Sequence, residues 1–327
     1  MKRFLLSFFA MFLCVLSLSA EGTITLKTSK AKGEKLNIRA YCATKNESFT
    51  IDWGDGEAQY YSIDPNGWTF SQYAKGDVKG DVITIKGDIV FFECTDSHLT
   101  SFTTSGMTKL ENIDLSNNDL TSFEATDLTA LKQLNLKGNK LGTTDDGKFD
   151  ITAAVPTLEV LNINDNHIGS MSLIKCVNLT HFYANNNGDM GAVVFPDGSE
   201  KLQTIEMNNC GLAHFYPISL PNLKTLYMSQ NYLMEIEEGG SYPSLQDFDI
   251  SNNYLTELYV TNYPKLERLD CSNNQLTVLN VSQNANLNSL KCASNKIKYL
   301  NTSKNPDLVT LYCNDNLLTA IDLGKNS

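Results

Sequence analysis

The sequence predicts an α/β-type, right-handed curved solenoid with a parallel β-sheet on its concave face and a mostly non-helical convex side, preceded by a small all-β module. Three observations lead to this fold class. An apolar pattern returns eleven times between residues 89 and 327, most often at intervals of 21 residues. Nine of these units carry Asn at their ninth position. Residues 21–88 do not repeat, and apolar and polar residues alternate there as they do in strands.

Residues 1–20 are expected to be a secretory signal peptide. Lys2 and Arg3 precede an apolar run that ends at Val15, and small residues follow up to Ala20. This order of basic, apolar and small-residue segments is typical of signal peptides, and the apolar run is short for a membrane span. The mature chain is therefore expected to be exported.

The charge of the chain disfavours two classes of partner. The formal net charge is −11, and without Lys2 and Arg3 it becomes 24 − 37 = −13. An acidic chain repels nucleic acid phosphates and anionic lipids, so we expect no nucleic-acid partner and no membrane-surface partner. No later apolar stretch is long enough to span a bilayer, so no membrane insertion of the mature chain is expected.

Residues 21–88 are predicted to form a small β-rich domain or cap. The segments that alternate with period two are Thr23–Lys27, Lys35–Arg39, Phe49–Trp53 and Val82–Lys86. Gly54, Asp55 and Gly56 follow the third of them and indicate a turn. A repeat array needs such a cap, because its open end would otherwise expose the hydrophobic core.

The repeat itself has the form Leu-x-x-Leu-x-(Leu/Cys)-x-x-Asn-x-Leu, seen at 266–276. Positions 1, 4 and 6 alternate as in a short strand, so they face the core while positions 3, 5 and 7 face outward. This is the pattern of a leucine-rich repeat. We predict eleven repeats, in a domain of residues 89–327, that begin at Ile89, Leu110, Leu131, Leu158, Leu179, Leu202, Leu223, Leu245, Leu266, Leu287 and Leu308.

Position 9 is expected to form a ladder of buried asparagines that satisfy backbone groups of the turn. Ser97 and Cys210 replace Asn in two repeats and are small enough for the same slot. The remaining residues of a 21-residue unit are too few for an α-helix, so turns, 3₁₀ pieces or short extended segments are predicted on the convex side. Insertions at Thr143–Lys148 and Asn187–Ala192 are expected to form loops.

Seven cysteines remain after the signal peptide, and most occupy core positions of the repeats. Cys271, Cys292 and Cys313 are expected to stack on adjacent strands with parallel side chains, which suits neither a disulfide nor a tetrahedral zinc site. Free cysteine behaves as a small buried hydrophobic residue. We therefore predict reduced structural thiols and no cofactor.

The sequence carries no motif of a known catalytic site. His98, His167, His181 and His214 have no nucleophile in a recognisable sequence context, and neither a phosphate-binding loop nor a zinc-protease motif is present. Asp52 and Asp55 flank a Gly-rich turn and offer a weak calcium site, but a role in forming the turn is favoured. The protein is not expected to be an enzyme.

The residues most informative about function are those at outward positions of the strands. Tyrosine is a preferred anchor at interfaces, although it also simply favours strands. The predicted partner site on the concave face consists of His181, Tyr183, Glu206, Tyr227, Asp247, Asp249, Arg268, Asp270 and Tyr312. A diffuse site, or a site on the convex face, remains the alternative.

The form Leu-x-x-Leu-x-Cys-Ser-Asn-Asn-x-Leu-Thr at 266–277 resembles the cysteine-bearing, 21-residue repeats of internalin-like bacterial surface proteins, including relatives in Bacteroidetes. Phe49–Glu57, with its Trp-Gly-Asp-Gly string, resembles PKD-like β modules. The resemblance implies a binder at the surface of a Gram-negative bacterium or outside the cell, with the periplasm as an alternative location. No LPxTG anchor motif is found, so cell-wall attachment is not implied.

These observations lead us to expect an adhesin or recognition module that binds a protein of a host or neighbouring cell through its concave face. Two alternatives stay open: a glycan-binding protein that uses tyrosines as sugar platforms, and a structural component of a surface or matrix. The chain is expected to be monomeric or to self-associate weakly through its last repeat. Only Lys325 and a few polar neighbours cover the core at that edge, and an exposed edge favours pairing.

Overall fold

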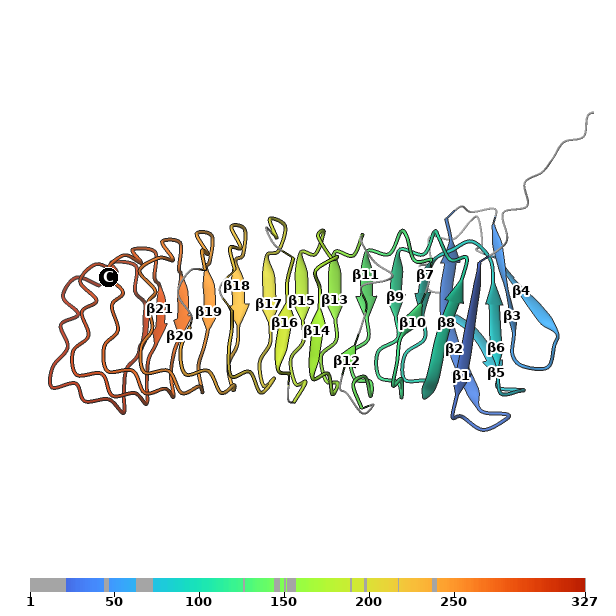
Figure 1. The fold of residues 1–327 in the computed structure, drawn as a ribbon, viewed down its shortest axis with the longest axis horizontal. Helices are drawn as coiled ribbons and strands as arrows, with labels where there is room; N and C mark the ends of the chain where they lie inside the picture. Colours follow the sequence, from blue (N-terminus) through green and yellow to red (C-terminus); the bar gives the residue numbers. More distant parts are fainter. Residues whose placement is uncertain are drawn as a thin grey trace, which may run out of the picture.

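The computed structural model shows an elongated solenoid with a β-sandwich module at its N-terminal end (Figure 1). The structure describes residues 22–326 apart from 44–46, 63–72, 126, 144–147, 150, 152–156, 189, 197–198, 217 and 237–239. The expected signal peptide, and residues 144–147 of the first predicted insertion, therefore lie outside the described residues.

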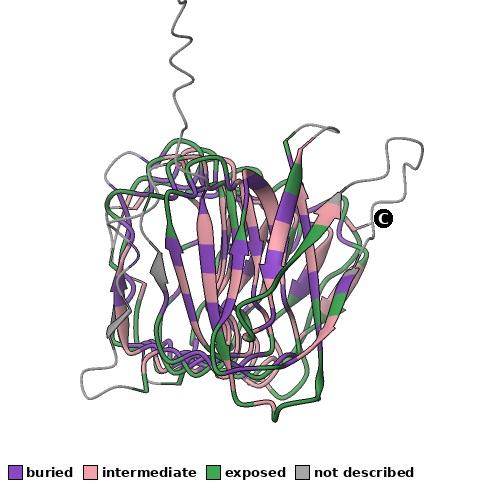
Figure 2. Ribbon diagram, turned by 90° about the vertical axis from the view of Figure 1, so that its right-hand side faces the viewer, coloured by how far each residue is buried: buried purple, intermediate pink, exposed green. Residues whose placement is uncertain are grey.

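The concave face is a thirteen-stranded sheet to which every predicted repeat contributes one strand. These eleven strands are parallel, and in ten of them a buried residue stands between two outward ones, as predicted (Figure 2). In the last strand the middle residue, Leu311, is only partly buried. From β9 onward each strand spans positions 3 to 5 of its repeat, and equal positions pair in register, as Leu226 pairs with Phe248. The strands are β7 (Ile89–Glu93), β9 (Asn112–Asp114), β11 (Gln133–Asn135), β13 (Val160–Asn162), β15 (His181–Tyr183), β17 (Thr204–Glu206), β18 (Thr225–Tyr227), β19 (Asp247–Asp249), β20 (Arg268–Asp270), β21 (Ser289–Lys291) and β22 (Thr310–Tyr312).

The predicted asparagine ladder is present at position 9. Asn231 is buried, and its Oδ1 accepts the backbone N–H groups of Cys210 and Leu212 at 2.9 and 3.0 Å. Its Nδ2 donates to the carbonyls of Met207 and Met228 at 2.8 and 2.9 Å. Each asparagine therefore joins its own turn to that of the preceding repeat. In all eleven repeats the residue just before the ladder position has a φ between 49° and 67°, which favours Asn, Asp and Gly there.

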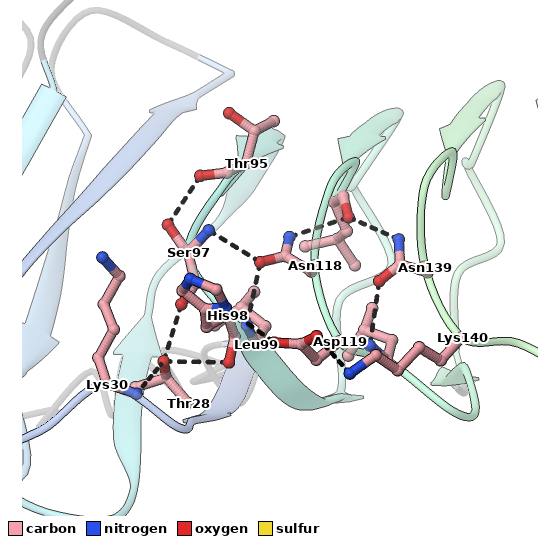
Figure 3. A network of polar contacts seen from close by, with 12 residues as sticks. Thr28, Lys30, Thr95, Ser97, His98, Leu99, Asn118, Asp119, Asn139 and Lys140 are labelled. Carbon is pink, nitrogen blue, oxygen red and sulfur yellow. Dashed lines mark hydrogen bonds and ion pairs between the residues drawn. The ribbon is translucent and has the colours of Figure 1, made fainter. Parts of the chain in front are cut away.

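The first ladder exception connects the solenoid to the module (Figure 3). Ser97 and Leu99 donate their backbone N–H groups to Asn118 Oδ1, both at 3.0 Å. Thr28 Oγ1, from the first module strand, donates to the carbonyl of Ser97 at 2.8 Å. The second exception, Cys210, is buried, and its Sγ lies 2.9 Å from the carbonyl of Ala184. Both small residues thus occupy the asparagine slot as predicted.

The convex side is non-helical, as predicted, and no α-helix occurs among the described residues. Its extended segments are β8 (Leu99–Ser105) and β10 (Glu124–Ala125), which pair in parallel, and a three-stranded parallel sheet of β12 (Lys148–Phe149), β14 (Ser170–Ser172) and β16 (Ala192–Val194). The described part of the chain contains no helix of the length and apolarity needed to cross a membrane.

The N-terminal module consists of β1 (Thr23–Thr28), β2 (Lys35–Cys42), β3 (Ser48–Asp52), β4 (Ala58–Ser62), β5 (Tyr73–Asp77) and β6 (Ile83–Lys86). Four of these strands match the predicted segments, whereas β4 and β5 were not predicted. β2 pairs with β7 and so extends the concave sheet, while β1 pairs with β8 and extends the convex side. The division between residues 88 and 89 and the PKD-like assignment stay predictions.

The described cysteines are all free, and all are buried except Cys313, which is partly buried at the last strand. The predicted stack is confirmed, because Cys271, Cys292 and Cys313 directly follow residues that pair in register. Burial raises the pKa of Cys94 and of Cys292 to about 12 and leaves little thiolate at neutral pH.

We expect iodoacetamide at pH 8 to alkylate Cys313 first in the native protein, because its thiol is the one that solvent reaches. Cys94, Cys271 and Cys292 should react about 100-fold more slowly or not at all, since the thiolate is the reactive form and burial suppresses it. Mass spectrometry of the alkylated peptides measures the order of labelling. Similar labelling rates for Cys313 and Cys271 in the native state would contradict the buried stack.

Candidate functional site: the concave face

The structure places the nine predicted site residues on one face of one sheet. They occupy positions 3 and 5 of their repeats, which are the first and last residues of each strand and face outward. Eight of them lie on the consecutive strands β15, β17, β18, β19 and β20. Tyr312 lies apart on β22, and Lys291 of β21 separates it from Asp270. We call the outward face of β15 to β20 the concave strip.

Arg268 of the concave strip and Lys291 of the adjoining strand β21 already have carboxylate partners. Arg268 forms a two-point ion pair with Asp247 of the neighbouring strand. Lys291 Nζ lies 3.3 Å from Asp270 Oδ2. These pairs hold two of the predicted acidic residues in place.

Glu206 and Asp249 have neutral partners instead. Asn185 Nδ2 donates to Glu206 Oε2 at 2.9 Å, and the backbone N–H of Ser251 donates to Asp249 Oδ1 at 3.0 Å. No described Lys or Arg forms an ion pair with either carboxylate. The middle of the concave strip is therefore negatively charged.

Two tyrosines stand among these carboxylates. Tyr183 and Tyr227 are half-buried, and burial raises the pKa of both phenols, with Glu206 adding to the effect at Tyr183 and Asp247 at Tyr227. The ring of His181 stacks on that of Tyr183 with centroids 6.2 Å apart. A partly buried aromatic ring with its hydroxyl at the surface is the kind of side chain that anchors protein interfaces.

Asp249 opposes folding at neutral pH. Burial raises its pKa above 3.8, and the neighbouring Asp270 adds to the shift, while the hydrogen bond from Ser251 works against it. The unfolded chain therefore releases this proton at lower pH than the folded protein does. Because the pKa of Asp249 is higher in the folded protein than in the unfolded chain, the contribution of this residue to stability is fully present at acid pH. It is lost as the pH rises through the pKa of the folded protein.

We expect Asp249→Asn to raise the free energy of unfolding modestly at pH 7, because the amide oxygen still accepts from Ser251 while the buried charge is removed. The difference from the wild-type chain should shrink as the pH falls below 3.8, where both chains are uncharged at this position. Denaturant unfolding at pH 7 and pH 3 measures it. A variant that is less stable than the wild type at pH 7 would contradict this interpretation.

One feature of the concave face was not predicted from the sequence. Arg39 of β2 lies over the ring of Phe91, 5.3 Å from its centroid, and its Nη1 is 3.2 Å from Glu93 Oε2. Tyr41 stacks on the same ring with centroids 4.7 Å apart. Period-two alternation from Lys35 places Arg39 and Tyr41 on one face of β2, but only the pairing of β2 with β7 shows that this face continues the concave sheet.

Asp52 and Asp55 hold the turn of the module. Asp52 Oδ1 accepts the backbone N–H groups of Gly54, Asp55 and Gly56 at 2.8 to 3.1 Å. Asp55 forms an ion pair with Lys79 at 2.5 Å, and this contact lowers the pKa of Asp55. No cluster of metal-ligating side chains occurs among the described residues. The contacts of these two aspartates therefore favour the turn role.

Apolar side chains are also exposed outside the concave face. On the convex side a small hollow beside β16 is lined by Val194, Phe215 and Tyr216. In the last repeat, Leu317, Ile321 and Leu323 are exposed by 55, 37 and 46%. A convex site and self-association through the last repeat both stay predictions.

No protein-family model matches the sequence, and no curated protein matches it either. Several solved structures match in fold. The functional domain of InlJ from Listeria monocytogenes, which includes a cysteine ladder, aligns with a TM-score of 0.61 and 22% identity over 74% of this chain. This chain spans 58% of the length of that structure.

Two further structures show the same architecture. An internalin of Listeria monocytogenes, InlF, has a TM-score of 0.51 and 19% identity over 70% of this chain and 74% of its own. TLR13, solved in complex with ssRNA13, has a TM-score of 0.52 and 17% identity over 64% of this chain and 33% of its own. The protein is thus a leucine-rich-repeat solenoid whose fold is similar to that of the listerial internalins.

Proposed function

We propose that this protein is an exported, non-enzymatic binding protein that recognises a protein partner through the concave strip. The observation that carries the proposal is the group formed by Tyr183, Glu206, Tyr227 and Asp249 at the same position of four adjacent strands. The sheet holds these side chains in fixed register, so a partner that fits them meets a preorganised surface.

The energetics of Asp249 support a binding role for this surface. Its half-buried charge destabilises the fold at neutral pH, and no described cation forms an ion pair with it, although Lys291 lowers its pKa. Groups that oppose folding in this way cluster at functional sites. The fold alone does not identify the partner, because a solenoid presents different side chains in each protein.

We expect the combined variant Tyr183→Thr, Tyr227→Thr and Asp249→Asn to lose partner binding by at least about 100-fold, because two aromatic anchors and a central charge are removed together. Residues 21–327 serve as bait on host-cell and bacterial-community extracts. The captured protein is then purified, and its Kd is measured for both baits. The melting temperature should change little, since all three side chains point outward.

A matched variant tests whether the concave face is responsible. Tyr259→Thr, Tyr299→Thr and Asp322→Asn make the same three changes at exposed residues outside the concave sheet. This control should bind the captured protein like the wild type. We call the combined variant of Tyr183, Tyr227 and Asp249 the concave variant. If it keeps partner binding, or if it and the control lose binding equally, the concave strip is rejected as the partner site.

A glycan ligand is the second candidate, because tyrosine rings also form platforms for sugars. Tyr232 and Tyr254 are exposed by 55 and 48%, and their rings stack with centroids 6.2 Å apart. A glycan array probed with residues 21–327 and with Tyr232→Ser separates the two candidates. Hits that disappear in this variant would favour the glycan ligand, and an array without hits would leave the protein partner.

A further inference from the structure

The concave sheet already binds one guanidinium group, which the chain itself supplies. Arg39 lies against Phe91 and Glu93, the outward residues at positions 3 and 5 of β7. The contact combines a cation–π interaction with a charge-assisted hydrogen bond, and each of these stabilises an arginine in its position. The outward positions of this sheet thus offer an aromatic ring and a carboxylate to the same arginine.

The same two kinds of group recur over β17 to β19. Glu206, Tyr227 and Asp249 occupy position 5 of three adjacent strands and pair in register. Adjacent strands lie about 4.8 Å apart, so the backbones that carry the two acidic residues are about 10 Å apart, with Tyr227 between them. No cation of the described chain lies in an ion pair with either carboxylate.

The surroundings leave the negative charge of this centre in place without adding to it. Over the concave strip and β21, the outward acidic residues are Glu206, Asp247, Asp249 and Asp270, and the outward cations are Arg268 and Lys291. Arg268 is paired with Asp247 and Glu267, and Lys291 is paired with Asp270, so no described cation forms an ion pair with Glu206 or Asp249. Lys291 lowers the pKa of Asp249 without pairing with it. A partner that brings one positive group to this centre has complementary charge.

We propose that Glu206, Tyr227 and Asp249 bind an arginine side chain of the partner protein, an assignment that rests on the proposed function of the concave strip. The guanidinium plane lies over the Tyr227 ring, and its N–H groups donate to Glu206 on one side and to Asp249 on the other. Arginine suits this centre better than lysine, because its planar fork stacks on a ring and offers several donors in fixed directions. The site uses the same kinds of group that hold Arg39, an aromatic ring and a carboxylate, but takes them from three adjacent strands instead of one, and its arginine comes from outside.

Three short probes test the assignment without the natural partner. Acetyl-Gly-Arg-Gly-amide is compared with its lysine and citrulline counterparts, since citrulline keeps the shape of arginine and lacks its charge. NMR titration of ¹⁵N-labelled residues 21–327 follows the backbone amides of Tyr227 and Asp249. We expect saturable shifts at these amides with the arginine peptide, binding about 3-fold weaker with lysine, and no saturable shift with citrulline.

The variants separate a specific site from general attraction to an acidic protein. Glu206→Gln, Asp249→Asn and Tyr227→Leu should each weaken binding of the arginine peptide about 3- to 10-fold. Asp114→Asn is the matched control, because it removes the same charge from position 5 of β9, several strands away. This control should bind the arginine peptide like the wild type.

Two results would overturn the arginine site. One is equal weakening by Asp114→Asn and Asp249→Asn, and the other is citrulline binding as tightly as arginine. The outcome is distinguishable from failure of the proposed function. If the concave variant keeps the natural partner while the arginine peptide still shifts Tyr227, the function fails and the site for a guanidinium stands. If the partner is lost but no peptide shifts Tyr227, only the arginine assignment fails.

Discussion

Replacing Asn231 with alanine is expected to lower the free energy of unfolding by about 4 kcal/mol, because each buried polar group left without a partner costs about 1–3 kcal/mol. Asn231 lies in the middle of the ladder and is 3% exposed. The substitution removes the acceptor of two buried N–H groups and the donor to three carbonyls, those of Cys210, Leu212, Met207, Met228 and Ser229. Alanine neither replaces these hydrogen bonds nor admits water freely to the turn.

Denaturant unfolding followed by circular dichroism measures this effect. Stability in a repeat protein is passed between neighbours, so hydrogen exchange should show the greatest loss of protection in the repeats that begin at Leu202 and Leu223. Asn262→Ala is the control, because Asn262 is an exposed asparagine outside the ladder. A loss of less than about 1 kcal/mol at Asn231, the usual scale of a surface substitution, would show that the ladder contributes little.

Trp53→Ala is expected to destabilise the N-terminal module by about 3–5 kcal/mol, the range found when a fully buried large aromatic is truncated. Trp53 is fully buried and is the largest fully buried side chain among the described residues. Its ring packs so closely on β5 that a Cβ placed on Gly76 would lie 2.1 Å from a ring atom. The alanine variant leaves a cavity that the two surrounding sheets cannot close without moving their backbones.

Loss of the module has a consequence for the repeats. The module strands β1 and β2 cover the first repeat by pairing with β8 and β7, so a variant that opens the module exposes the core around Phe92 and Phe102. Differential scanning calorimetry should show that the variant unfolds at a lower temperature than the wild type. Binding of a hydrophobic dye should report the newly exposed apolar surface. Tyr60→Ala, at a residue of β4 that is 81% exposed, is the control and should leave both readouts unchanged.

The structure contains a second asparagine ladder, at position 19 of the last repeats, that was not predicted from the sequence. Asn284 and Asn305 are fully buried at position 19, and Asn284 Nδ2 donates to the carbonyls of Val260 and Tyr263, both at 2.9 Å. Their spacing of 21 residues, continued by Asn326, was a visible signal. It was overlooked because earlier repeats place hydrophobic residues such as Leu128 and Leu220 in this slot.

The sequence predicted which residues form the candidate site, but not which of them are paired with charged partners. Alternation along each strand identifies outward residues, and a constant repeat length brings Tyr183, Glu206 and Tyr227 into register. Which of the acidic residues already have a cation is not visible in the sequence. Asp247 and Asp249 are both aspartates and stand two positions apart on one strand. Arg268 forms an ion pair with Asp247, whereas Asp249 accepts a hydrogen bond from a backbone N–H.

The sequence by itself determined the solenoid, its eleven strands, the cysteine stack and which site residues face outward. It did so because a repeat has short-range rules: the side chains of a strand alternate, and each unit packs only on its neighbours. The tertiary structure alone decided that β2 and β5 lengthen the concave sheet and that Arg39 meets Glu93. These features depend on pairing between segments without a common period, and there the packing of whole sheets, rather than any local pattern, selects the partners.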